Sequence, residues 1–165
     1  MRKLLVIAVL MSILSSCSLM YDIQDDVFYD EIGDGYSLYT PEWIDEIDDI
    51  SDVQEVISNH ITYESESGDT WQSPETTCEK GTGDCEDYAI LMIDILYLKF
   101  GTEANLAIVE SDECRSVVNG SLDVDHAIVE CDGVYYEATA KFYKTYDDVT
   151  VCYRYTFDEL FKEVN

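Results

Sequence analysis

One apolar helix constrains the fold of this chain more than any other feature. From Cys85 to Phe100 the sequence has the length and composition of a helix, and Gly101 is typical of a helix end. A helix that is apolar on nearly every side, outside a membrane, has to be buried by other elements. The sequence therefore predicts a central helix with the domain built around it. Its apolar positions are Ala89, Ile90, Met92, Ile93, Ile95, Leu96 and Leu98.

Short helices are predicted before this central helix, and strands after it. Thr40-Pro41 and Ser73-Pro74 have the pattern of helix starts, and Ser51-Asp52-Val53-Gln54 has that of a capping box. After Gly101 the spacing of apolar residues changes to that of strands, and Asp132-Gly133 is a strong hairpin signal. Helices followed by antiparallel strands predict an α+β domain. The predicted strands are 104–110, 125–131, 134–140 and 149–156, and 157–164 is a predicted closing helix.

The first residues have the pattern of an export signal. A basic start is followed by an apolar run from Leu4 to Leu14 that is too short to span a bilayer, and then by Ser15-Ser16-Cys17. This segment resembles a bacterial lipoprotein signal, which implies lipid attachment to Cys17 and a place in the cell envelope. An ordinary signal peptide with a chance cysteine is the alternative. We therefore predict a signal peptide (1–16), an acidic tether or arm (17–40) and one domain (41–165).

The charge balance argues against one class of partner. The chain has 9 basic and 36 acidic residues, and removal of the signal peptide would take away Arg2 and Lys3 but no acidic residue. So negative a protein repels nucleic acids and anionic lipid surfaces. We expect no nucleic-acid binding, and membrane attachment only through the lipid. The sequence leaves the oligomeric state open.

A glycine-rich turn, Gly81-Thr82-Gly83-Asp84, precedes the cysteine that opens the central helix. The free amides and the positive dipole end of a helix start favour a thiolate, so we expect Cys85 to be a nucleophile with a lowered pKa. Pairing strands across the predicted hairpin brings His126 diagonally near Glu137. Cysteine, histidine and carboxylate form the set used in thiol acyl transfer. We predict that His126 takes the thiol proton and that Glu137 orients His126.

Four tracts resemble motifs of the transglutaminase-like, papain-like cysteine peptidase superfamily. The resemblance implies a Cys-bearing helix packed on an antiparallel sheet, and a thiol hydrolase (peptidase or amidase) or an acyltransferase that acts on a peptide or protein through a thioester. The family usually has Asp as the third member, and the longer side chain of Glu137 would be less fixed. The tracts are Gly83–Ala89, His126–Glu130, Tyr136–Thr139 and Trp71–Thr76.

The resemblance also implies an oxyanion donor upstream of the nucleophile. Gln72 and Trp71 are the candidates, with the backbone amide of Cys85 as the second donor. Some bacterial peptidases of this group bind calcium beside the nucleophile, and Asp84 and Glu86 match those positions. Apart from calcium, we expect no cofactor.

Two alternatives to the enzyme stay open at this point. The domain could be a catalytically inactive envelope module that binds a peptide or protein partner. It could also be a structural lipoprotein with a Cys78–Cys85 disulfide, and the sequence does not choose a pairing among Cys78, Cys114, Cys131 and Cys152. His60, late in an amphipathic helix, is expected to be structural. Exported location and small size favour hydrolysis over acyl transfer.

Overall fold

The computed structural model of the protein describes residues 35–65, 70–109, 126–147 and 149–161. The chain divides into Met1–Gly33, which lies outside the described residues, and Asp34–Asn165. The predicted signal peptide, the lipidation site Cys17 and Cys114 therefore lie outside this description. Within the described ranges, no helix is long and apolar enough to cross a membrane.

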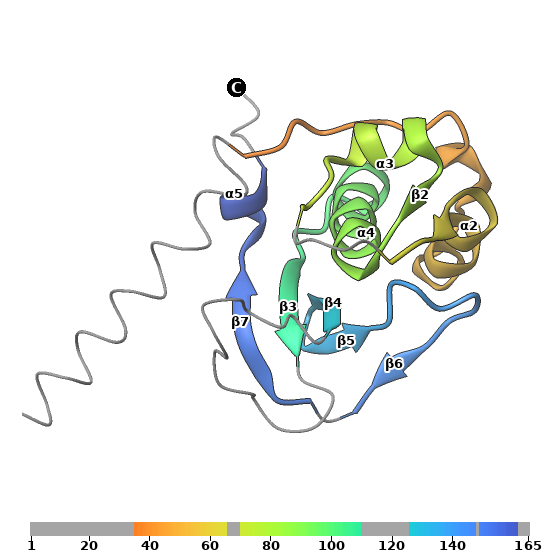
Figure 1. The fold of residues 1–165 in the computed structure, drawn as a ribbon. Helices are drawn as coiled ribbons and strands as arrows, with labels where there is room; N and C mark the ends of the chain where they lie inside the picture. The colour runs from red at the N-terminus through yellow and green to blue at the C-terminus, as the bar shows by residue number, and fades with distance from the viewer. Residues whose placement is uncertain (1–34, 66–69, 110–125, 148, 162–165) are drawn as a thin grey trace, which may run out of the picture. The chain divides into compact units, whose positions relative to one another are not determined.

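Helices and an antiparallel sheet form the described domain, so the α+β prediction is confirmed. Figure 1 shows α2, α3 and α4 grouped on one side of the five-stranded sheet. The sheet has the strand order β6-β5-β4-β3-β7, and β1 and β2 form a separate parallel pair. The helices are η1 (Ile44–Glu46), η2 (Ile50–Asp52), α2 (Val53–His60), α3 (Pro74–Lys80), α4 (Cys85–Phe100) and α5 (Phe157–Leu160). The strands are β1 (Thr62–Tyr63), β2 (Thr82–Gly83), β3 (Asn105–Val109), β4 (His126–Cys131), β5 (Val134–Tyr136), β6 (Thr145–Tyr146) and β7 (Val151–Tyr155).

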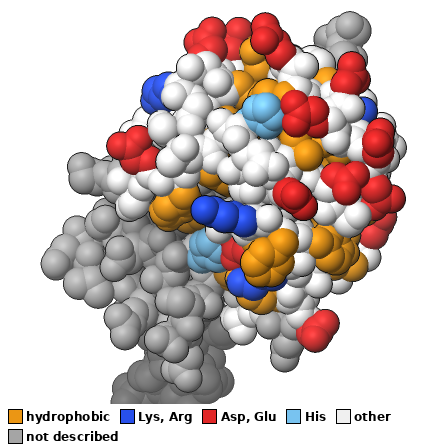
Figure 2. Space-filling view, turned by 90° about the vertical axis from the view of Figure 1, so that its right-hand side faces the viewer, with side chains coloured by type: hydrophobic (Ala, Val, Ile, Leu, Met, Phe, Trp, Pro, Cys, Tyr) orange, Lys and Arg blue, Asp and Glu red, His pale blue; other side chains and the backbone are white. Residues whose placement is uncertain are grey.

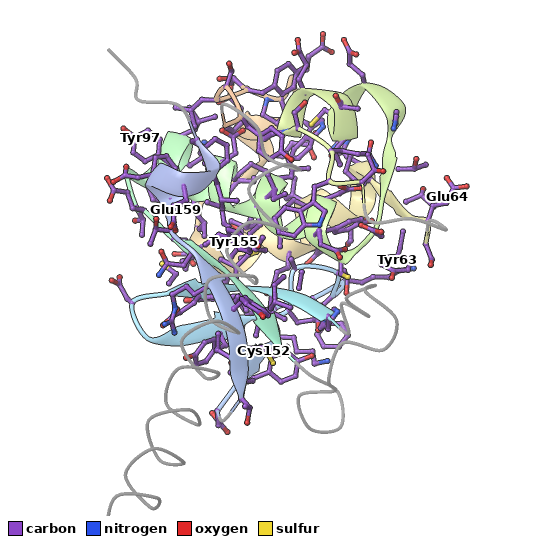
Figure 3. All side chains as sticks on the ribbon, turned by 60° about the vertical axis from the view of Figure 1, so that its left-hand side comes forward. Tyr63, Glu64, Tyr97, Cys152, Tyr155 and Glu159 are labelled. Atoms are coloured by element: carbon purple, nitrogen blue, oxygen red, sulfur yellow. The ribbon has the colours of Figure 1, made fainter. Side chains whose placement is uncertain are left out.

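Helix α4 is the central helix that the sequence predicts. It begins at Cys85 and ends at Phe100, and every side chain from Cys85 to Leu96 is buried. Gly101 ends it in the left-handed conformation, with φ of 65°. In the last turn of α4, Tyr97 stacks on Phe157 of α5, with ring centroids 4.5 Å apart. Figure 3 shows Tyr97 beside α5.

Two differences from the predicted elements concern caps and strand ends. The capping box before α2 is formed by Asp49 and Asp52, and Ser51 instead donates its N–H and hydroxyl to Asp49. The strand predicted for 134–140 ends at Tyr136, because the next residues form a turn in which the Ala140 N–H donates to the Glu137 carbonyl at 3.1 Å. The short strands β1, β2 and β6 were not predicted.

The hairpin between β4 and β5 forms as predicted. Asp132 and Gly133 both have positive φ, 52° and 78°, as a two-residue hairpin turn of this kind requires. The register pairs Cys131 with Val134 and Glu130 with Tyr135, which also agrees with the sequence. This register brings the start of β4 close to the residues that follow β5.

A buried carboxylate interrupts the apolar surface of α4. Asp94 has no exposed surface, and both of its oxygens lie 3.3 Å from the backbone N–H of Tyr39, near the end of the predicted arm. Burial raises the pKa of Asp94 to about 7, although the Tyr39 N–H acts in the opposite direction. The core therefore holds a carboxyl group whose charged form is unfavourable.

We expect the Asp94→Asn variant to be more stable than the wild type at pH 8, by about 2–4 kcal/mol. The folded-state pKa of Asp94 lies above its unfolded value of 3.8, so ionisation costs stability progressively as the pH rises toward 7. At pH 4 the difference should nearly vanish. Urea unfolding at both pH values measures it, and Asp45→Asn, at a carboxylate whose side chain is 99% exposed, is the control. An equal difference at both pH values would contradict this account.

Candidate active site

A tight turn places Cys85 at the first position of α4. Gly81 ends α3 in the left-handed conformation, with φ of 67°. At Gly83 a Cβ atom would lie only 2.7 Å from the Cβ of Asp87, so this position needs glycine. Asp84 then caps the helix through reciprocal bonds with Asp87. The glycines of the motif thus allow the turn to pack closely against the helix that carries Cys85.

Asp87 ties the segment before the turn to the helix start. It is buried and accepts the backbone N–H of Gln72 at 2.7 Å, the side-chain amide of Gln72, and the Asp84 N–H at 3.2 Å. The Gln72 amide nitrogen also lies 3.4 Å from the Thr82 carbonyl oxygen, and its own Oε1 is buried without a partner. An acceptor oxygen cannot stabilise an oxyanion, so an oxyanion role for Gln72 would require its bonds to break and stays a prediction.

Trp71, the other oxyanion candidate, contacts two tyrosines. Its side chain is buried, and its ring packs edge-on against Tyr155 with centroids 5.2 Å apart. Its carbonyl accepts the Tyr36 hydroxyl at 3.2 Å. These contacts fix the backbone of Trp71 next to Gln72.

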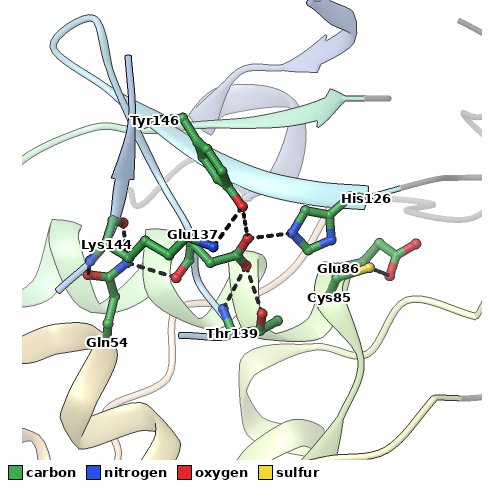
Figure 4. Close-up of polar contacts among 8 residues, drawn as sticks. All are labelled: Gln54, Cys85, Glu86, His126, Glu137, Thr139, Lys144 and Tyr146. Atoms are coloured by element: carbon green, nitrogen blue, oxygen red, sulfur yellow. Dashed lines mark hydrogen bonds and ion pairs between the residues drawn. The ribbon is translucent and has the colours of Figure 1, made fainter. Parts of the chain in front are cut away.

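His126 and Glu137 meet as the sequence predicts. The Nε2 atom of His126, the first residue of β4, lies 2.8 Å from the Oε2 atom of Glu137. Figure 4 shows His126 between Glu137 and Cys85. Because an ionised carboxylate only accepts hydrogen bonds, Nε2 carries the proton, and in a neutral ring Nδ1 is then the acceptor.

The carboxylate of Glu137 is fixed by two further residues. Its Oε1 accepts the backbone N–H of Thr139 at 3.2 Å and the Thr139 hydroxyl at 2.7 Å, while the Tyr146 hydroxyl donates to Oε2. Burial would raise the pKa of Glu137, but the bonds from His126, Tyr146 and Thr139 outweigh it and lower the pKa to about 2. The longer side chain is therefore not loosely oriented. No role was predicted for Thr139 or Tyr146 from the sequence.

The Cys85 thiol donates a hydrogen bond to the neighbouring residue, Glu86. It is 8% exposed, and its Sγ lies 3.0 Å from the Oε2 of Glu86, which is also buried. Burial, and then the Glu86 carboxylate, raise the pKa of Cys85, while the Ala127 amide lowers it. The predicted lowering by the helix start is therefore wrong in this structure. The Ala127 contact nevertheless places the sulfur against the strand that begins at His126.

Tyr63 lies at the rim of the site. It pairs with Gly83 across the β1–β2 ladder, and its ring leans on Tyr88 with centroids 6.2 Å apart while 52% of the residue stays exposed. Figure 3 shows Tyr63 at the edge of the domain. Burial raises the pKa of its phenol, and four acidic groups of the site raise it further: Cys85, Asp84, Glu86 and Glu137.

The site reaches the protein surface. The His126 side chain is 27% exposed, whereas that of Glu137 is only 7% exposed. Figure 2 shows the two histidines on one face of the domain, with Lys or Arg and hydrophobic side chains around one of them. A substrate can therefore approach the imidazole while the carboxylate behind it stays shielded from water.

The described residues contain no group of three or more His, Cys, Asp or Glu side chains arranged to hold a metal ion. Of the two calcium candidates, Asp84 caps α4 and Glu86 accepts the Cys85 thiol, so both have other partners. A calcium ion here would have to displace those bonds.

The remaining residues singled out from the sequence are the other cysteines and His60. Cys78 and Cys85 are not joined by a disulfide, so the alternative of a disulfide between them is wrong, and Cys131 is a free thiol as well. His60 stacks on Trp43 with ring centroids 4.7 Å apart and bonds to Glu46 at 3.1 Å, in agreement with a structural role.

Comparison with known proteins shows the family of this chain. The family model of the transglutaminase-like superfamily matches residues 40–131, a range that includes Cys85 and His126 and ends before Glu137. A crystal structure of a candidate cysteine protease from Cytophaga hutchinsonii is 16% identical, with a TM-score of 0.40 over 82% of this chain and 50% of that one. The chain thus spans about half the length of that structure, and no curated protein matches. Since the family match covers more than half of the sequence, this chain belongs to the transglutaminase-like superfamily.

Proposed function

We propose that this protein is a thiol-dependent hydrolase that cleaves an amide bond in a peptide or protein. Membership of the superfamily supports a thiol-dependent hydrolase or a related activity. The observation that carries the specific proposal is the 2.8 Å bond between His126 Nε2 and Glu137 Oε2, because it leaves Nδ1 as the proton acceptor beside a helix-start cysteine.

The proposed reaction uses the three side chains in turn. Nδ1 of His126 takes the proton of the Cys85 thiol, and the sulfur attacks the substrate carbonyl carbon. The Cys85 backbone N–H at the start of α4 can donate a hydrogen bond to the oxyanion that forms. When the C–N bond breaks, the imidazolium returns its proton to the leaving amine and a thioester remains. Glu137 stabilises the positive charge on His126 throughout.

The thioester can react in two ways. Water activated by His126 gives hydrolysis and restores the thiol, whereas an amine in place of water gives acyl transfer. The exposed part of His126 lets water reach the imidazole, which favours hydrolysis. Export of the protein and its lipid anchor on Cys17 are part of this proposal, and they place the substrate in the cell envelope.

Trapping of the thioester tests the proposal. The protein is mixed with a set of activated peptide esters, quenched in acid and mapped by mass spectrometry. We expect one acyl group on Cys85, its absence in the Cys85→Ser variant and its unchanged formation in Cys78→Ser, which removes a thiol on the neighbouring helix α3. Equal acylation of several cysteines, or none, would count against a nucleophilic Cys85.

An inactive binding module is the second candidate, and one observation favours it. The thiol is buried and donates to Glu86, so in this conformation its proton is directed away from His126. Such a module should bind peptides with the same affinity after Cys85→Ser and should form no thioester. Calorimetry on both proteins, alongside the trapping experiment, separates the two functions.

A further inference from the structure

We propose that Gln54 is a positioning residue that holds Glu137 in place against His126. This inference rests on the proposed function, in which Glu137 orients the histidine. Gln54 lies on α2, far from the site in sequence, and it touches none of the reacting groups directly. It acts through the backbone of the segment that carries Glu137.

Gln54 is fully buried, and its carboxamide makes three hydrogen bonds to backbone atoms (Figure 4). The Nε2 atom donates to the carbonyl oxygens of Glu137 at 2.7 Å and Lys144 at 2.8 Å. The Oε1 atom accepts the Lys144 N–H at 3.0 Å. Since the Glu137 N–H also donates to the Lys144 carbonyl at 3.0 Å, both ends of the segment 137–144 are tied to each other and to α2.

The sheet alone does not hold Glu137. The ladder between β4 and β5 ends at Tyr136, and the ladder between β5 and β6 ends where Tyr136 pairs with Thr145. The turn that contains Glu137 therefore extends beyond the β5 and β6 ladders. Gln54 bonds the two groups that a longer ladder would pair with each other, the Glu137 carbonyl and the Lys144 N–H. Because α2 packs on α4, the same contact connects the helix that carries Cys85 to the turn that carries Glu137.

Only a side-chain amide satisfies these three atoms. A glutamate would place a carboxylate oxygen against two carbonyl oxygens. A leucine would remove one donor from each carbonyl, leaving them only the N–H groups of Ala140 and Glu137, and would take the Oε1 acceptor from the Lys144 N–H. In either case we expect the turn to shift. Small displacements of this kind reduce turnover strongly when they move a group that orients the proton acceptor.

The test compares Gln54→Leu and Gln54→Glu with Ile57→Val, a fully buried position on the same helix whose side chain has no polar atom to bond the turn. The first readout is the ¹⁵N spectrum of the His126 ring in a His60→Gln background, which leaves one histidine in the numbered sequence. The wild type should carry its proton on Nε2, and both Gln54 variants should show mixed tautomers. The second readout is kcat, which should fall roughly 10- to 100-fold.

Ile57→Val should lower stability without changing either readout. If the Gln54 variants are destabilised but keep the wild-type tautomer and kcat, Gln54 is only structural and the inference is overturned. If Gln54→Leu does not fold, Gln54→Asn takes its place. Its carboxamide lies one methylene further from the turn, so we expect smaller changes of the same kind in the tautomer and in kcat. The tautomer needs no substrate, so a shift in the ring spectrum of a protein without turnover would uphold the positioning role and reject the hydrolase.

Discussion

Replacing Glu137 by Gln is expected to lower kcat by roughly 10³- to 10⁴-fold and to leave the fold intact. The two side chains have the same shape, but the amide no longer forces the His126 proton onto Nε2. An amide N–H placed toward Nε2 would instead favour the proton on Nδ1, and Nδ1 could then not take the Cys85 proton. Steady-state kinetics on the peptide identified by thioester trapping measure the loss. KM should change little, because Glu137 is shielded behind the imidazole.

Two further variants make this prediction specific. Glu130→Gln removes a neighbouring carboxylate of β4 that pairs with Arg154, and we expect it to leave kcat within about twofold of the wild type. Glu137→Asp introduces the family's usual residue in a site built around a longer one. The shorter side chain cannot reach Thr139, Tyr146 and His126 together, so we expect an intermediate kcat. A Glu137→Gln enzyme with near wild-type kcat would remove Glu137 from the mechanism.

The parts of the site that local sequence patterns encode could be predicted. The helix from Cys85 to Phe100, the glycine turn before it and the Asp132-Gly133 hairpin each depend on neighbouring residues, and all three form as predicted. The meeting of His126 with Glu137 followed from the hairpin register. Each of these inferences needed only the spacing of residues along a short segment.

What holds Glu137 in place could not be predicted, because the contacts join distant segments through atoms without a sequence signal. Gln54 reaches backbone groups 83 and 90 residues away, and a buried glutamine on a helix resembles any other polar residue in the sequence. Tyr146 lies on a strand of two residues, too short for a periodic pattern. The pKa of Cys85 was predicted in the wrong direction, since the sequence shows the helix start but not the burial of Cys85 and Glu86.

That burial leads to the second large effect, an increase in thiol reactivity in the Glu86→Gln variant. The Glu86 carboxylate is the next cause, after burial, of the raised pKa of Cys85, through its charge and its hydrogen bond. Without that charge the pKa of Cys85 should fall, and the pH profile of alkylation should shift to lower pH. Each unit of pKa changes the thiolate fraction about tenfold, so we expect iodoacetamide to react with Cys85 at least about tenfold faster at pH 8.

Cys78 provides the control within the same protein. Burial, and then Asp94, raise its pKa to about 12, and Glu86 is not among the causes, so its alkylation rate should be the same in both proteins. Mass spectrometry after timed quenching gives both rates at once. Equal Cys85 rates in the wild type and Glu86→Gln would show that Glu86 does not hold the thiol proton. Faster alkylation together with faster thioester formation would show that this bond limits the wild-type nucleophile, because the hydrogen bond from the thiol to Glu86 must break before His126 can take the thiol proton.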